Sequence, residues 1–107
     1  MGASKLAIHT TEQLEIATLA KVLAHPARVA ILQYIAKQHG CICDDIVKEI
    51  GLSQATISQH LQVIKNAGLL KGDFQGKSIC YCLNTKAFKL FQNRINSYFN
   101  ATAAQCC

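Results

Sequence analysis

The chain has 107 residues, half of them hydrophobic, with eleven lysines and arginines against six acidic residues, which gives a formal net charge of +5. This length fits one domain over residues 1–107, with flexible ends expected at 1–10 and 102–107, and excludes two sizeable cores. The apolar runs are too short to span a membrane and no export signal is recognisable, so we expect a cytoplasmic protein. Its six cysteines should then remain thiols and serve metal or redox chemistry. The charge favours DNA as a partner, although solvated lysines would produce it too.

The first expected helix begins after Thr11, a good N-cap, and repeats apolar residues at three- and four-residue steps. His25-Pro26 ends it, because the residue before a proline avoids the α region, while Pro26 suits the first turn of the next helix. That second helix runs to about Gln38 and stops near Gly40. Its buried face is predicted to contain Ile31, Leu32 and Ile35.

Two further helices are predicted in the middle of the chain. One begins around Asp44, since two acids in its first turn suit the positive end of the helix dipole, and Gly51 closes it. The next is capped by Ser53 and runs from Gln54 to Ala67. The inner faces of the two helices are predicted to contain Ile46, Val47, Ile50, Ile57, Leu61 and Ile64.

A short hairpin and a last helix complete the chain. Strands are expected at Leu69 to Phe74 and at Ser78 to Leu83, and alternation in the second strand places Cys80 and Cys82 on the outer face. The last helix, about Lys86 to Ala101, has more aromatic surface than one small domain can cover. We expect it to pack on the first helix of a partner subunit in a homodimer, the alternative being its own core. Its stripe comprises Phe88, Phe91, Ile95, Tyr98 and Phe99.

Two helices joined by Gly51-Leu52-Ser53 and followed by a hairpin indicate a mainly α fold with a small β-hairpin, a dimeric winged helix-turn-helix. In this fold the N-terminal half of the second helix lies in the major groove of DNA. Polar side chains there can hydrogen-bond bases, as glutamine does with adenine, and lysines contact phosphates. A merely solvated polar face is the alternative. The predicted DNA contacts are Gln54, Thr56, Ser58, Gln59, His60, Lys65, Lys71 and Lys77.

The segments LAHPARVAILQYI (Leu23 to Ile35) and LSQATISQHLQVIKNAGLL (Leu52 to Leu70) resemble the arsenic-repressor (ArsR/SmtB) family of winged-helix repressors. The resemblance covers about Thr11 to Asn84. It implies a homodimer that occupies double-stranded operator DNA and dissociates when an inducer binds. Position 25 often holds aspartate in this family, and we interpret His25 as structural.

In the arsenic- and cadmium-responsive members a Cys-x-Cys pair opens the helix before the recognition helix, and Cys41 and Cys43 fall there. Thiolates are soft donors that favour soft ions. The resemblance therefore implies arsenite or antimonite, As(III) or Sb(III), as the inducer, with Cd(II) or Pb(II) as rivals and no required cofactor. A further cysteine that the arsenic type often carries one turn on is replaced by Ile46.

The Cys-x-Cys spacing restricts the geometry of this site. Two residues apart on an α-helix lie about 200° around the axis, so the segment is better read as strand-like, with Ile42 inward. Cys80-Tyr81-Cys82 repeats the pattern, and four thiols would meet on one outer sheet face if the two segments paired. The predicted metal ligands are Cys41, Cys43, Cys80 and Cys82, with Cys106 and Cys107 as less favoured candidates.

Other interpretations remain open at this point. Cys80 and Cys82 suit ordinary strand positions, and the thiols suit a redox or persulfide switch equally well. A metal-buffering protein would store ions on the same pairs without a recognition helix. A zinc or nickel site on the last helix is not expected, because residues 88–99 contain no histidine and no acid. An enzyme is not expected either, since no nucleophile lies near a recognisable base.

Overall fold

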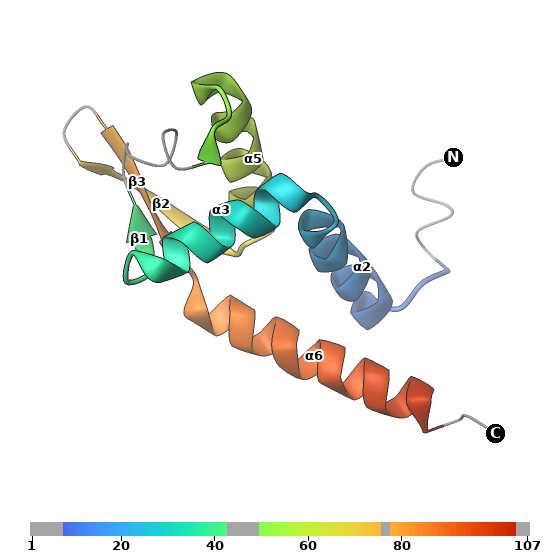
Figure 1. Cartoon of the computed structure of the whole chain (residues 1–107). Helices are drawn as coiled ribbons and strands as arrows, with labels where there is room; N and C mark the ends of the chain where they lie inside the picture. Colours follow the sequence, from blue (N-terminus) through green and yellow to red (C-terminus); the bar gives the residue numbers. More distant parts are fainter. Residues whose placement is uncertain (1–7, 43–49, 76–77, 105–107) are drawn as a thin grey trace.

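The computed structural model describes residues 8–42, 50–75 and 78–104, without the side chains of residues 73–79. Within these residues the chain is mainly helical with a small antiparallel sheet, which confirms the predicted fold class (Figure 1). Most of the helix expected from Asp44 lies outside the described residues, as do Cys43, Lys77, Cys106 and Cys107. The elements are α2 (Thr11–Leu23), α3 (Pro26–Lys37), β1 (Cys41–Ile42), α5 (Gln54–Asn66), β2 (Leu70–Gln75), β3 (Ser78–Leu83) and α6 (Thr85–Ala103).

Helix α2 begins one residue earlier than the sequence suggests. Its N-cap is Thr10, whose hydroxyl accepts a hydrogen bond from the Gln13 backbone N–H at 3.1 Å. The Gln13 side chain in turn accepts one from the Thr10 N–H at 3.0 Å. This reciprocal capping box satisfies two backbone donors that the first turn leaves open. Thr11 is therefore the first helical residue and not the cap.

The cap of α5 and the place of Pro26 in the first turn of α3 are those expected. His25 is the N-cap of α3, with Pro26 in the first turn, and Ser53 is the N-cap of α5. Gly51, just before α5, has φ +81°, a left-handed conformation that glycine adopts without strain. Helix α5 ends at Asn66, one residue before the expected end.

The sheet has the strand order β1-β3-β2, and both pairings are antiparallel. Strand β2 begins at Leu70, one residue later than expected, and the Leu69 carbonyl just before it accepts a hydrogen bond from the Asn84 N–H at 2.9 Å. Strand β1 has two residues and adds to the free edge of the hairpin. Through this pairing, the strand that precedes the helix-turn-helix lies beside β3, the second strand of the wing, which is the hairpin of β2 and β3.

The core lies between α2, α3, α5 and the sheet. The predicted inner faces of α3 and α5 are confirmed, since Ile31, Ile35, Ile57 and Ile64 are fully buried. Val22 supplies the buried residue of α2, a position that the helical pattern did not single out. The remaining members of the core cluster are Leu32, Ile42, Leu61, Leu69 and Leu70.

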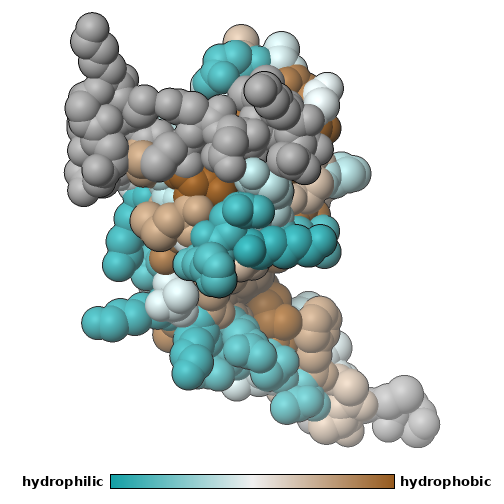
Figure 2. All heavy atoms as spheres, turned by 60° about the vertical axis from the view of Figure 1, so that its left-hand side comes forward, coloured by the Kyte–Doolittle hydropathy of each residue, from teal (hydrophilic) through white to brown (hydrophobic). Residues whose placement is uncertain are grey.

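Helix α6 projects from this core along its own direction (Figure 1). The Cα radius of gyration is 16.1 Å, whereas a compact chain of this length has about 13 Å. Phe91 is buried, but Leu90, Tyr98 and Phe99 are 54%, 47% and 58% exposed. In Figure 2 brown and tan residues gather on one side of the lower part of the molecule, where α6 lies.

Two further points concern α6. The helix includes Thr102 and Ala103, two residues beyond the expected start of a flexible end, and begins at Thr85 with Asn84 as its N-cap. An ion pair between Arg94 Nε and Glu15 Oε2, 3.0 Å apart, joins it to α2.

In the described part of the chain, no helix has the length and apolar character needed to cross a lipid bilayer.

Candidate functional site

Helix α5 presents a polar face to solvent because its buried residues, Ile57, Leu61 and Ile64, occupy the opposite face. Of the predicted DNA contacts, Gln54, Ser58, Gln59, Lys65 and Lys71 are exposed, and Thr56 and His60 are half-buried.

The N-terminus of α5 is held by Ser53. Its hydroxyl oxygen accepts a hydrogen bond from the Thr56 N–H at 3.2 Å and donates to Thr56 Oγ1 at 2.9 Å. The Gln54 amide lies 3.4 Å from Ser58 Oγ, one turn further on. Because the cap fixes the first turn, the polar side chains that the sequence singled out stand on an ordered helix end.

His60 faces α3. Its Nδ1 accepts a hydrogen bond from Arg28 Nε at 3.3 Å, and its ring meets the His25 ring edge-on, with centroids 4.5 Å apart. Desolvation by burial, followed by the charges of His25 and Arg28, lowers the pKa of His60 below its usual 6.5. His25 itself accepts a hydrogen bond from the Ala27 N–H at 3.3 Å, which confirms its structural interpretation.

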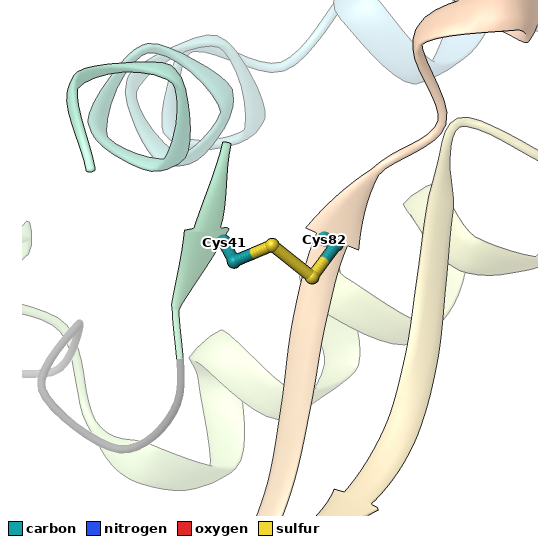
Figure 3. The surroundings of a disulfide bond; sticks show 2 residues. All are labelled: Cys41 and Cys82. Atoms are coloured by element: carbon teal, nitrogen blue, oxygen red, sulfur yellow. A yellow bond between two sulfur atoms is a disulfide. The ribbon is translucent and has the colours of Figure 1, made fainter. Parts of the chain in front are cut away.

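The thiol pairs come together through the sheet. Cys41 on β1 lies opposite Cys82 on β3, with a Cα–Cα distance of 4.0 Å. The two sulfur atoms form a disulfide (Figure 3). This differs from the expectation that the cysteines remain thiols, because antiparallel pairing brings the two side chains into direct contact. The strand-like reading is confirmed for Cys41 and Ile42, since Ile42 is buried at 4% exposure, whereas Cys43 lies outside the described residues.

Cys80 differs from the expectation of an outward-facing, accessible thiol. It is buried, at 9% exposure, and it is disulfide-bonded. It does not belong to the core cluster, to which the opposite face of the sheet contributes Ile42 and Leu70. The outer face is therefore covered at Cys80 and more open at Cys82, which is half-buried.

A row of three side chains crosses the outer face of the sheet. Cys82 lies opposite Cys41 on one side and opposite Lys71 of β2 on the other. Residues directly opposite one another in an antiparallel sheet share a face, with Cβ atoms about 5 Å apart. Lys71, singled out as a phosphate contact, is therefore also the cross-strand neighbour of Cys82.

The described residues contain no cluster of three or more histidine, cysteine or acidic side chains that would hold a metal ion by themselves. Of the six predicted cysteine ligands, the structure places Cys41, Cys80 and Cys82 and brings the first and last into contact.

Sequence reasoning missed Asn84, which joins α5 to α6. Its side-chain amide donates to the Gly68 carbonyl at 3.0 Å, its backbone N–H donates to the Leu69 carbonyl, and its Oδ1 accepts from the Ala87 N–H. Asparagine just before a helix is a common N-cap, so a local signal was present. The link to Gly68, sixteen residues away, had none.

Residues 25–71 match the family model described as bacterial regulatory protein, arsR family. The chain is 34% identical to the transcriptional repressor PagR of Bacillus anthracis, with a TM-score of 0.58 and coverage of 67% of this chain and 82% of PagR. The chain belongs to the arsR family. This confirms the resemblance found in the sequence. It also confirms that the chain is not an enzyme, because the arsR family consists of regulatory proteins.

Two curated relatives within the arsR family have similar sequence identity to this chain. The HTH-type transcriptional regulator NmtR of Mycobacterium tuberculosis is 36% identical over 70 residues, 64% of this chain and 57% of NmtR. The cadmium resistance transcriptional regulatory protein CadC homolog of Staphylococcus aureus is 35% identical over 78 residues, 71% of this chain and 63% of the relative. The chain thus spans about half the length of the first curated relatives that it matches.

Proposed function

We propose that this arsR-family protein is a dimeric repressor that binds operator DNA and dissociates when a thiophilic ion binds its cysteine thiolates. The observation that carries the proposal is the meeting of Cys41 and Cys82 on a strand pair next to the wing. Strand β2 of this sheet follows the recognition helix in the chain. An ion bound at the sheet can therefore affect the DNA contacts directly. The protein would act in the reducing cytoplasm, where the bridge can be opened.

The DNA face comprises the polar end of α5 and the lysines beside it. Gln54, Ser58 and Gln59 are exposed on the first two turns, where a recognition helix contacts base edges. Lys65 and Lys71 flank them and suit phosphate contacts, which position the protein without reading sequence. Lys77, which lies outside the described residues, is proposed as a further phosphate contact from the sequence.

The dimer would form through α2 and α6. A groove of about 670 Å³ between these helices has Ile16, Ile95, Tyr98 and Phe99 among its lining. A second copy related by a two-fold axis would cover the same surface on both subunits. Large aromatic side chains at about half exposure are unusual on a monomer, and their burial supplies the driving force.

The ion would bind the reduced site. Opening the Cys41–Cys82 bridge takes two electrons and two protons from two cellular thiol molecules, which are oxidised to one disulfide, and leaves two protein thiols. Their Cα atoms are 4.0 Å apart, so both sulfurs reach one ion at bonds of about 2.3 Å, the zinc–thiolate value. Lys71 beside Cys82 favours the thiolate form that binds metal.

We propose Cys80 and Cys43 as further ligands, once the disulfide of Cys80 has also been reduced by two more thiol molecules. Cys80 lies two residues before Cys82 on β3, and Cys43, which lies outside the described residues, is proposed from the sequence. As(III) or Sb(III) is the inducer that the family pattern favours, and Cd(II), named in the CadC homolog's description, is the main rival. Cys106 and Cys107 are alternative third ligands.

Release requires that the ion favour a dimer shape that fits DNA poorly, by no more than its differential affinity for the two shapes. Strand β3 lies between β1 and β2, and β2 follows the recognition helix after Gly68-Leu69. An ion that changes the separation of β1 and β3 would therefore shift the wing against α5.

The test is a fluorescence anisotropy titration of duplex DNA from the upstream region with reduced protein. Arsenite, antimonite, cadmium, lead and zinc are then added in turn. We expect release by the thiophilic ions for wild type and none for Cys41→Ser/Cys82→Ser. Ser58→Ala/Gln59→Ala should lose binding to this duplex while still binding arsenite. Failure of the wild type to bind any DNA at low salt would favour a metal-buffering protein instead.

A thiol-redox or persulfide switch is the second candidate, and the disulfide itself favours it. The same two thiols would then be oxidised by a disulfide or polysulfide, which accepts the two electrons. Mass spectrometry separates the candidates. Release by polysulfide together with a loss of two hydrogens or a gain of sulfur supports the redox switch, whereas release by arsenite alone supports the metal site.

A further inference from the structure

Arg28 connects three helices at the base of the recognition helix. Its Nη1 donates to the carbonyls of Lys21 and Val22, at 3.4 and 3.5 Å, in the last turn of α2. Its Nε donates to Nδ1 of His60 on α5 at 3.3 Å. Arg28 itself lies in the first turn of α3. A planar guanidinium with donors in a fixed fork is suited to hold such partners at set angles.

The contact requires one protonation state of His60. Nδ1 can accept the Arg28 proton only while it is unprotonated, so the neutral ring carries its hydrogen on Nε2. A second proton would occupy Nδ1, remove the acceptor and place a cation against the guanidinium. His25, whose ring lies edge-on at 4.5 Å, would add to this repulsion if charged.

The groups around His60 come from two helices. His25 and Arg28 face it from α3, and α2 contributes the backbone carbonyls that hold Arg28. The ion pair of Glu15 with Arg94 lies elsewhere, between α2 and α6.

We propose that Arg28 is a positioning residue for DNA binding, which sets the angle of the recognition helix through neutral His60, so that protonation of His60 weakens sequence-specific binding. The proposal rests on the proposed repressor function. His60 lies on the same two turns as the exposed Ser58 and Gln59. A shift of its ring away from Arg28 therefore moves the side chains that reach base edges.

The pH window follows from the lowered pKa of His60. Because the folded chain holds this proton less tightly than the unfolded chain, neutral His60 contributes its full stabilisation above about pH 6.5. This contribution decreases as the pH falls from 6.5 toward the lowered pKa. If protonation acted only by adding positive charge, DNA binding would strengthen as the pH falls, because the added charge strengthens the attraction to phosphates.

The experiment compares an upstream duplex with an unrelated duplex of equal length, at pH 7.5 and 5.5 and constant ionic strength, with reduced protein. For wild type we expect the preference for the upstream duplex to fall at least about threefold at pH 5.5. His60→Asn retains an acceptor near the Nδ1 position without a titrating ring, so its preference should not change with pH. His39→Asn, at an exposed position with φ +62° that asparagine tolerates, is the matched control and should keep the wild-type trend.

A double-mutant cycle tests the role of Arg28 directly. Arg28→Gln and His60→Leu should each weaken specific binding at pH 7.5 by about tenfold, the usual worth of a hydrogen bond to a charged group. The double variant should lose no more than either alone. Circular dichroism and thermal melting identify variants that fail to fold, in which case Arg28→Lys, which keeps the charge without the fork, replaces Arg28→Gln.

Additive losses in the cycle, or a His60→Asn variant with the wild-type pH trend, would overturn the inference while leaving the repressor function intact. A wild-type protein without preference for the upstream duplex at pH 7.5 would overturn both.

Discussion

Replacing Phe99 by serine should separate the proposed dimer. Phe99 is 58% exposed in the single chain, and a buried aromatic side chain covers about 200 Å². Covering its exposed part therefore removes about 115 Å² from water, worth about 3 kcal/mol at 25 cal/mol per Å². Two-fold symmetry doubles this to about 6 kcal/mol per dimer, an upper value because association carries its own entropic cost. We expect the dimer dissociation constant to rise at least about 100-fold.

The assay is sedimentation velocity over a dilution series, with wild type, Phe99→Ser and Asn100→Ser measured side by side. Asn100 is the adjacent, exposed position on α6, so its substitution introduces the same residue without removing apolar surface. Circular dichroism should show equal helix content in all three proteins. A Phe99→Ser variant that dimerises as tightly as wild type would refute a dimer built on this side of α6, and a wild type that stays monomeric at every concentration would refute the dimer altogether.

Three further predictions concern the sheet and the helix cap. Without reductant, the Cys41→Ser/Cys82→Ser variant should have a free energy of unfolding about 4 kcal/mol below that of wild type, because it lacks the bridge that closes a loop with a sequence separation of 41; equal urea midpoints of the two proteins would contradict this. In reduced protein, Lys71→Gln should slow alkylation of Cys82 severalfold relative to Lys65→Gln, because the neighbouring cation stabilises the thiolate; mass spectrometry measures both rates. Ser53→Ala should cost about 1 kcal/mol in thermal unfolding, and Ser53→Asp should restore most of it, as both oxygens cap the helix.

Local chemistry made most of the helices predictable. Ser53 is a cap in the structure as in the sequence, and His25-Pro26 separates α2 from α3 as expected, since these signals depend on three or four neighbouring residues. The same kind of signal was present for α2, where Thr10 and Gln13 form the capping box pattern, but the choice of Thr11 overlooked it. Such errors move a boundary by one residue and leave the buried faces unchanged.

Contacts between residues distant in the sequence were harder to predict. The alternation of Cys80-Tyr81-Cys82 indicated a shared face for the thiols, and the pairing of β1 with β3 brings Cys41 and Cys82 together. Alternation cannot show what covers an outer face, so the burial of Cys80 was not foreseen. The bond from Arg28 to His60 spans 32 positions and has no periodic signature in the sequence.

Asn84 has a consequence for the DNA that a dimer would select. Its amide ties the end of α5, at Gly68, to the first turn of α6. In a pair of subunits joined along α6, this tie sets how far each reading helix stands from the symmetry axis. That separation fixes the number of base pairs between the two halves of a palindrome, about ten centre to centre or a multiple of it. A substitution at Asn84 would thus alter the preferred spacing of the two halves and leave the preferred bases within each half unchanged.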